Sequence, residues 1–257
     1  MHDTAREFAK EFFQRYLTGQ SLQILEVGSQ NFNGTMRDVA PSHAEYIGID
    51  IAPGPGVDVV LQDPYRFPFE DSRFDAVVST SCFEHDQMFW LTFLEMARVA
   101  RGGGYIYLNA PSNGKYHPYP VDNWRFYPDA AGALTAWARR EGQSVELLES
   151  FIGRRKNDTW NDCVMIFAKP CTAPFAPRSK VVDAFPDAFN IRGSAEDPVT
   201  NFSEDTEDMM LLTEAQRAPL SGFNAQRYLA ANPDVRAAGI NPYEHYMVHG
   251  WREGRRW

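Results

Sequence analysis

The sequence predicts an α/β protein with a doubly wound, mostly parallel seven-stranded sheet, followed by an acidic linker and a small helical module. Over residues 1–170, short apolar runs alternate with segments of helical periodicity, which is typical of parallel strands joined by crossover helices. Residues 171–221 are rich in acidic side chains and prolines. Residues 222–257 regain regularly spaced aromatic positions. These three stretches are the predicted domains.

The elements of the first stretch follow from its periodicity. Ala5, Phe8, Phe12 and Tyr16 recur at helical spacing, which predicts an amphipathic helix over residues 4–18. A crossover helix is expected over 89–99. A last helix begins at Pro128, where proline is best tolerated, and ends at Gly142. Strands are expected at 22–27, 45–50, 57–61, 74–80, 104–110, 145–148 and 162–168.

The second and third stretches differ in texture. Between Cys171 and Ser221 nine acidic residues stand against four basic ones without periodicity, which indicates a linker that forms no core of its own. Breaks at Asn232-Pro233 and Gly239–Pro242 then predict two short helices. This tail resembles a module appended to bacterial glycosyltransferases and secreted proteins, so we expect it to bind a protein partner.

Composition excludes several classes of function. The net charge of −9 and the pI of about 5.2 argue against a nucleic-acid partner. Three cysteines form no disulfide framework, which favours a reducing compartment. The N-terminal residues lack the pattern of a signal peptide, and no apolar run is long enough to span a membrane. We therefore expect a cytoplasmic protein.

Two strand ends carry the strongest functional signal. An apolar run ends in Glu26 and turns through Gly28, and the next strand ends in Asp50. The carboxyl ends of parallel strands meet at one edge of an open α/β sheet, and nucleotides bind there. Because a carboxylate only accepts hydrogen bonds, Asp50 is suited to the two hydroxyls of a ribose. The sequence therefore predicts an adenosine-containing cofactor.

The turn after the first strand indicates which cofactor. A nicotinamide-type loop has glycine at its first, third and sixth positions, which here hold Gly28, Gln30 and Asn33. Two of the three glycines that would let a pyrophosphate approach are missing. Glu26 would also repel a phosphate, whereas it suits a cationic amino-acid group. These features favour S-adenosylmethionine over NAD.

Three further segments, Asp63–Phe69, Phe74–His85 and Arg98–Ser112, occur in an order and spacing that resemble the class I S-adenosylmethionine-dependent methyltransferases, in particular the type-11-like branch. The resemblance covers about residues 20–170 and implies a Rossmann-like fold. Ser29–Asn33 departs from the glycine-rich loop of the family, and Ala100–Gly102 lacks its usual proline.

Strand-end geometry and this resemblance together imply the roles of the cofactor site. Glu26 and Gly28 would line the methionine half of the cofactor, and Asn33 and Gly34 would complete that loop. Asp50 would accept from the ribose, Ile51 would pack on the adenine and Asp63 would accept from its amino group. Ser81 would lie where cofactor and acceptor meet.

The acceptor side is predicted from two further segments. His85, just past the fourth strand, is the candidate general base, because histidine titrates near neutral pH. The aromatic loop at 115–128 matches a segment of a branch found near bacterial surface-glycan genes. An aromatic cap on the sheet edge is the alternative interpretation of that loop. The predicted substrate-binding residues are Cys82, His117, Tyr119, Trp124 and Arg125.

No metal site is predicted. Cys82 and His85 offer two zinc ligands, which is too few, and His245 and His249 stand four residues apart without a third ligand nearby. The predicted function is S-adenosylmethionine-dependent methyl transfer to a hydroxyl of a sugar or glycan intermediate. Methylation of a small phenol or carboxylate is one alternative. A catalytically silent binding protein that keeps the fold is the other.

Overall fold

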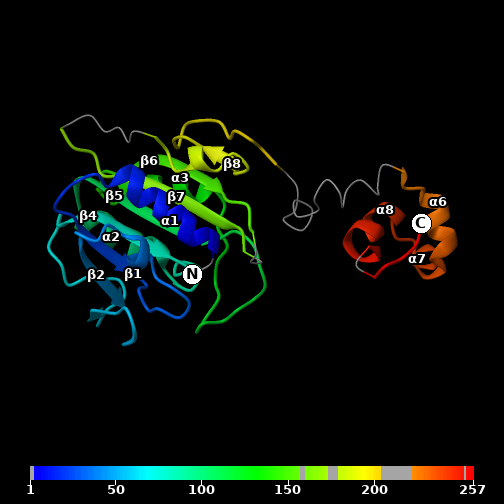
Figure 1. Cartoon of the computed structure of the whole chain (residues 1–257), viewed down its shortest axis with the longest axis horizontal. Helices are drawn as coiled ribbons and strands as arrows, with labels where there is room; N and C mark the ends of the chain where they lie inside the picture. The colour runs from blue at the N-terminus through cyan, green and yellow to red at the C-terminus, as the bar shows by residue number, and fades with distance from the viewer. Residues whose placement is uncertain (1–2, 157–159, 173–178, 204–221, 252) are drawn as a thin grey trace. The chain divides into compact units, whose positions relative to one another are not determined.

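The computed structural model divides the chain into two compact units, Met1–Ser203 and Glu204–Trp257 (Figure 1). It describes residues 3–156, 160–172, 179–203, 222–251 and 253–257. Among these residues, no helix has both the length and the apolar character needed to cross a membrane. The sheet belongs to the first unit, and the helical tail belongs to the second.

One eight-stranded sheet forms the centre of the first unit, in the order β3-β2-β1-β4-β5-β7-β6-β8. The strands from β3 to β5 pair in parallel, and the pairings of β7, β6 and β8 are antiparallel. This confirms the predicted mostly parallel sheet. The strands are β1 Gln23–Val27, β2 Glu45–Asp50, β3 Val59–Val60, β4 Phe74–Thr80, β5 Ala100–Pro111, β6 Glu146–Ile152, β7 Asp162–Ala168 and β8 Phe189–Arg192.

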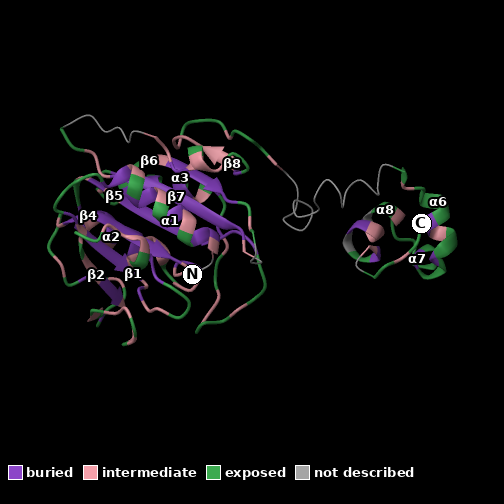
Figure 2. Ribbon diagram, viewed as in Figure 1, coloured by how far each residue is buried: buried purple, intermediate pink, exposed green. Residues whose placement is uncertain are grey.

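Helices cover both faces of the sheet. Helix α1 (Asp3–Tyr16) lies across one face, and α2 (Phe89–Val99) and α3 (Asp129–Arg140) pack together on the other (Figure 1). All three agree with the helices expected from the sequence. The strands are buried on both faces (Figure 2). Their alternate side chains join different cores, since Val77 packs with α2 and α3 while Val78 packs with α1.

The connection from β1 to β2 contains no α-helix. Residues 28–44 include only a short 3-10 helix, η1 (Met36–Val39), which the Thr35 side chain caps by accepting from the Arg37 amide. A dinucleotide-binding unit would begin a long helix here and hold its pyrophosphate at the helix N-terminus. The observed connection therefore agrees with the argument against NAD.

The structure places the end of the first domain later than the predicted boundary at residue 170. β8 lies inside the predicted linker and pairs with β6, with Ile152 opposite Phe189. The buried Glu149 carboxylate accepts from the amides of Val181 and Val182, at 2.8 and 2.9 Å, and from the Tyr16 hydroxyl. These contacts join residues 179–203 to the sheet. Residues 204–221 lie outside the described residues.

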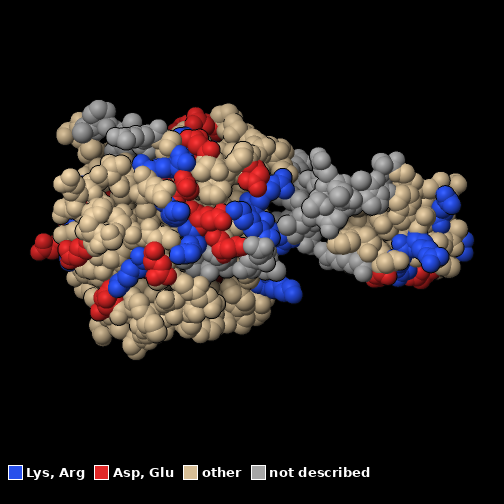
Figure 3. Space-filling view, viewed as in Figure 1, with Lys and Arg blue, Asp and Glu red and all other residues tan. Residues whose placement is uncertain are grey.

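Acidic and basic side chains are interspersed over the face of the first unit that Figure 3 shows. The ion pairs of the first unit include Arg98 with Asp71 and Arg15 with Glu11, each at 2.7 Å. The described part of this face has no continuous basic stripe of the kind that follows a nucleic-acid backbone. The expectation that nucleic acid is not a partner stays a prediction.

The second unit is a small helical module with its own aromatic centre. Its helices are α6 (Ala225–Ala231), α7 (Pro233–Ala237), α8 (Pro242–His245) and the π-helical turn η4 (Tyr246–Gly250). The Tyr228 hydroxyl hydrogen-bonds His245 Nδ1 at 2.8 Å, and the Phe223 ring contacts Tyr228, Tyr246 and Trp257. His245 therefore contributes to the packing of this module.

Candidate active site

A cleft opens at the carboxyl ends of β1 and β4. It holds about 410 Å³ of space between its walls, part of it open to solvent. Four predicted cofactor residues, Glu26, Gly28, Gly34 and Ser81, line it together. The sequence analysis did not identify its other lining residues, which are Ser29, Gln30, Phe32, Thr35 and Thr80.

Glu26 provides a buried carboxylate in this cleft. Its side chain is almost fully buried, and its Oε2 accepts from the Tyr46 hydroxyl at 2.9 Å and from Thr35 Oγ1 at 3.2 Å. Burial outweighs these hydrogen bonds and raises the pKa of Glu26 to about 7. A cationic group bound beside it would favour the ionised form.

This pKa predicts a pH-dependent affinity for S-adenosylhomocysteine, which carries the same amino-acid group as S-adenosylmethionine. Since Glu26 ionises as the pH rises through about 7, calorimetry should show about tenfold tighter binding at pH 8 than at pH 6. The same shift makes the unliganded fold lose stability over the interval from pH 4.5 to 7, because only the unfolded chain is ionised there.

The Glu26→Gln variant should lose this pH dependence. Glu45→Gln is the matched control, because Glu45 is an exposed residue of β2 outside the cleft, and it should keep the dependence. A pH-dependent affinity that survives in Glu26→Gln would assign the effect to another group.

Gly28 allows two strand ends to approach closely. Its φ of +76° is in the left-handed region, and a Cβ built on it would lie 2.5 Å from Cys82 Sγ. Cys82 thus packs against the cofactor turn, and burial raises the pKa of its thiol. Its predicted contact with the substrate stays a prediction, because Cys82 is not among the residues that line the cleft.

We expect Gly28→Ala to lower the free energy of unfolding by about 2–4 kcal/mol, from overpacking and backbone strain combined. In a domain of this size that corresponds to a fall in Tm of about 4–16 °C. Gly132→Ala in α3 is the matched control, because a Cβ there meets nothing within 4 Å. It should raise the stability by about 0.5–1 kcal/mol. An unchanged Tm for Gly28→Ala would contradict the close approach.

Asp50 shapes the cofactor loop from the neighbouring strand. Its Oδ2 accepts from the Gln30 amide at 3.0 Å, and its Oδ1 accepts from the Ile51 amide at 2.7 Å. Each oxygen keeps acceptor capacity for a ligand hydroxyl. Ile51 is 59% exposed beside it, so its apolar side chain is available to pack against a flat ring.

Four predicted cofactor residues do not line the cleft, namely Asn33, Asp50, Ile51 and Asp63. Asn33 is exposed and does not line it. Asp63 is exposed after β3, and its Oδ1 accepts from the Tyr65 amide at 2.9 Å, which is typical of a turn-initiating aspartate. The geometry gives Asp63 a structural role, and its contact with adenine stays a prediction.

The polar groups of the cleft fit S-adenosylmethionine. Within the described residues, three residues that line it, Ser29, Thr80 and Ser81, have a buried hydroxyl oxygen with no hydrogen-bond partner in the protein. Buried polar groups are rarely left unsatisfied, so they indicate a polar ligand. Together with the Glu26 carboxylate they suit the ammonium and carboxylate of an amino acid.

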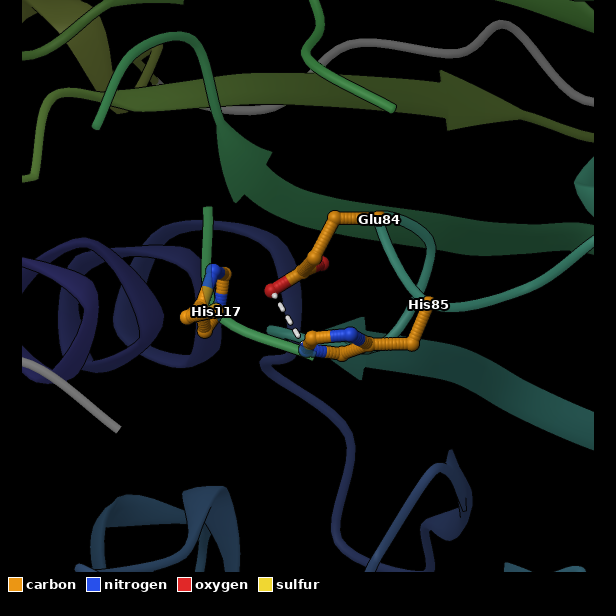
Figure 4. Close-up of side chains that lie close together, drawn as sticks. All are labelled: Glu84, His85 and His117. Atoms are coloured by element: carbon orange, nitrogen blue, oxygen red, sulfur yellow. Dashed lines mark ion pairs between the residues drawn. The ribbon is translucent and has the colours of Figure 1, made fainter. Parts of the chain in front are cut away.

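His85 lies beside Val121 and His117, two residues of the loop after β5 whose proximity was not predicted from the sequence. Its Nδ1 is 2.5 Å from the Val121 carbonyl oxygen, and its Nε2 is 3.5 Å from Glu84 Oε1. The rings of His85 and His117 lie 4.9 Å apart, so Glu84, His85 and His117 form one group (Figure 4). Burial raises the pKa of Glu84 to about 8 and lowers that of His85.

The predicted acceptor loop is held against this group. Arg125 pairs with Asp122 through two contacts, Nη1–Oδ1 at 2.5 Å and Nη2–Oδ2 at 2.8 Å, and this keeps the pKa of Asp122 well below its usual range. Trp124 Nε1 donates to the Asp86 carbonyl at 2.8 Å. The Tyr119 ring contacts Phe32 of the cofactor loop at 4.9 Å. The loop therefore borders the cleft.

Comparison with known proteins identifies the kind of domain that contains this cleft. A family model described as a methyltransferase domain matches residues 18–108. The matched residues 18–108 thus carry a methyltransferase domain of the class I S-adenosylmethionine-dependent kind. The match contains β1 and β4, whose ends form the cleft, and it confirms the predicted family. The sequence resemblance proposed for the C-terminal module has no such support.

The methyltransferase domain has similar curated and solved relatives. Phthiotriol/phenolphthiotriol dimycocerosates methyltransferases of Mycobacterium tuberculosis and Mycobacterium bovis are 29% identical to it over 116 residues, which cover 39% of this chain and 42% of theirs. The chain thus spans less than half the length of these relatives. The Burkholderia thailandensis 1,6-didemethyltoxoflavin-N1-methyltransferase, solved with S-adenosylhomocysteine, shares its fold with a TM-score of 0.53. That similarity has 14% identity and covers 66% of this chain and 80% of the other.

Proposed function

We propose that the chain is an active methyltransferase that methylates a hydroxyl of a sugar or glycan intermediate. The observation that carries this proposal is the cleft itself. Glu26 lies inside it, Asp50 holds its loop, and an aromatic loop with hydrogen-bonding side chains borders it. A scaffold without activity would have no need of a buried carboxylate and three unsatisfied hydroxyls at this edge.

The residues of the cleft divide the work of binding the cofactor. Glu26, with Ser29, Thr80 and Ser81, would hold its amino-acid end, and Asp50 would accept from the ribose hydroxyls. Bound S-adenosylmethionine supplies a methyl group that its positive sulfur already activates. The protein must then align the acceptor, and such positioning is worth up to about 7–11 kcal/mol.

The aromatic loop supports a sugar acceptor. Tyr116 and Tyr119 are 76% and 60% exposed, and Trp124 is 37% exposed. Flat rings can pack on the apolar face of a sugar, while nearby polar side chains bind its hydroxyls. The names of the mycobacterial relatives, which specify phthiotriol dimycocerosates, keep a lipid acceptor as the second candidate. A small phenol or carboxylate is the third.

His85 is our candidate for the group that activates the acceptor hydroxyl. The Val121 carbonyl accepts from His85 Nδ1–H, so the lone pair lies on Nε2. His85 follows Ser81 of the cleft by four residues, and it contacts the acceptor loop through His117. His117 and Arg125 are proposed to bind the acceptor from that loop.

The experiment that tests this function is deletion of the encoding locus in the host, followed by mass spectrometry of its glycans, lipids and metabolites. Loss of one CH₂ increment of about 14 daltons from a sugar-containing compound is expected, since each methyl transfer replaces H by CH₃. The same loss from a lipid would select the second candidate. No mass change, together with calorimetric binding of S-adenosylhomocysteine, would indicate a catalytically silent binding protein.

We also propose that residues 222–257 bind a protein partner and that the protein acts in the cytoplasm. The compact aromatic centre of the second unit supports a module with a function of its own. Co-purification with and without residues 222–257 tests the first proposal. Imaging of the tagged full chain in its host tests the second.

A further inference from the structure

We infer that Glu84, His85 and His117 form a binding site for a divalent transition-metal ion. One ligand atom of each side chain lies within 4.8 Å of the other two. Figure 4 shows the three side chains converging from two segments, the loop after β4 and the loop after β5. Two imidazoles and one carboxylate are a frequent donor set for such ions. No metal site was predicted from the sequence, because only Cys82 and His85 were considered as ligands. The proximity of His117 to His85 could not be predicted from the sequence.

Both histidines have the supporting contacts that metal ligands need. His85 Nδ1 is 2.5 Å from the Val121 carbonyl oxygen, and His117 Nδ1 is 3.2 Å from Asp122 Oδ2. A histidine that binds a metal through one ring nitrogen nearly always donates the other N–H to a carbonyl or carboxylate. The Val121 contact assigns the N–H of His85 to Nδ1. His117 Nδ1 also lies 3.4 Å from Arg125 Nη2, and the shorter contact with Asp122 favours an N–H on Nδ1, which leaves both Nε2 lone pairs available.

The carboxylate of the group is also incompletely satisfied. Glu84 is 1% exposed, and its Oε2 has no hydrogen-bond partner among the described residues. Glu84 interacts electrostatically with Asp122, Asp162 and Arg125. A divalent cation bound to the Glu84 carboxylate would offset the cost of burying its charge. The raised pKa of Glu84 has the same origin in burial without enough positive charge.

The donor set also selects the class of ion. Mg²⁺ and Ca²⁺ prefer oxygen ligands, whereas imidazole favours ions such as Zn²⁺. Three protein ligands leave a position for a further oxygen, as in catalytic zinc sites. The His117 side chain is 36% exposed, so this position can be reached from solvent.

The position of the site indicates what the ion would do, and only this role rests on the proposed function. Glu84 follows Ser81 of the cofactor cleft by three residues, and His117 belongs to the proposed acceptor loop. An acceptor hydroxyl bound to the ion would have a lowered pKa and would release its proton to solvent water. His85 would then serve as a ligand in place of acting as the free base.

Titration of the full chain with zinc tests the inference. After dialysis against a chelator, calorimetry should show one equivalent of Zn²⁺ bound, and Mg²⁺ should not compete. His117→Ala should weaken zinc binding by more than the roughly 10–100-fold that loss of a supporting contact causes. Because buried Glu84 is more sensitive to change, Glu84→Gln is the second variant. Unchanged S-adenosylhomocysteine binding in both variants shows that the domain remains folded.

The second unit provides the matched control. Its His245 and His249 rings lie 5.6 Å apart and offer another pair of imidazoles. The His245→Ala/His249→Ala variant should bind zinc as the unaltered chain does. Zinc binding that is lost only in this control, or that is undiminished in His117→Ala, would overturn the inference. Zinc binding without any methyl transfer would leave it standing and would contradict the proposed function.

Discussion

Replacing Asp50 with alanine should weaken the binding of S-adenosylhomocysteine by at least about 10²-fold, beyond the range of routine calorimetry. Two hydrogen bonds from ribose hydroxyls to a carboxylate are worth about 1.5–3 kcal/mol each. Loss of both therefore removes about 3–6 kcal/mol of binding free energy. The variant also leaves the Gln30 amide without its acceptor, which loosens the cofactor loop.

Two further variants separate these contributions. Asp50→Asn keeps the size of the side chain and one acceptor oxygen but loses the charge, so it should fall between the unaltered chain and Asp50→Ala. Asp129→Ala removes an exposed aspartate that pairs with Arg192 far from the cleft, and it should bind normally. Normal binding by Asp50→Ala would mean that the cofactor lies elsewhere.

The His85→Ala variant should have a kcat about 10²–10⁴-fold lower, the usual contribution of a general base, with an unchanged affinity for S-adenosylhomocysteine. The two quantities separate because His85 lies outside the residues that line the cofactor cleft. Loss of a metal ligand at this position predicts the same fall in kcat. Zinc titration of the variant distinguishes these two roles.

His43→Ala is the matched control for this experiment. His43 is exposed, and its Nε2 contacts only the Gly19 carbonyl oxygen among the hydrogen bonds of the described residues. It should have the turnover of the unaltered chain. Full turnover by His85→Ala would remove His85 from the chemistry but would leave the methyltransferase assignment intact.

The sheet could be predicted from the sequence because its strands are buried on both faces. Such strands form largely apolar runs, as in Asp162–Ala168, whose seven residues are all buried and all apolar after the first. β8 could not be predicted in this way. It has four residues, of which only Phe189 is buried, and it lies in an acidic stretch. What fixes it is the long-range contact of Glu149 with Val181 and Val182, which leaves no periodic pattern.

In the candidate site too, residues at strand ends could be predicted from the sequence, whereas residues on irregular loops could not. Glu26, Gly28 and Ser81 could be predicted because they follow strand ends, and parallel strands bring such ends together. Phe32 and Thr35 were missed because the irregular loop that carries them has no repeat to read. The approach of His117 to Glu84 depends on the path of a loop rich in proline. The ion pair of Arg125 with Asp122, which fixes part of that loop, was not predicted either.

The pairing of β8 with β6 also reduces the tendency of the protein to self-associate through the edge of its sheet. Without residues 189–192, the backbone N–H and C=O groups along that edge of β6 would be unpaired. An unpaired strand edge can pair with strands of neighbouring chains. A shortened chain that ends at residue 170, where the methyltransferase domain was first expected to stop, would therefore be prone to aggregate. Residues 189–192, which the sequence assigns to a linker, therefore also limit self-association.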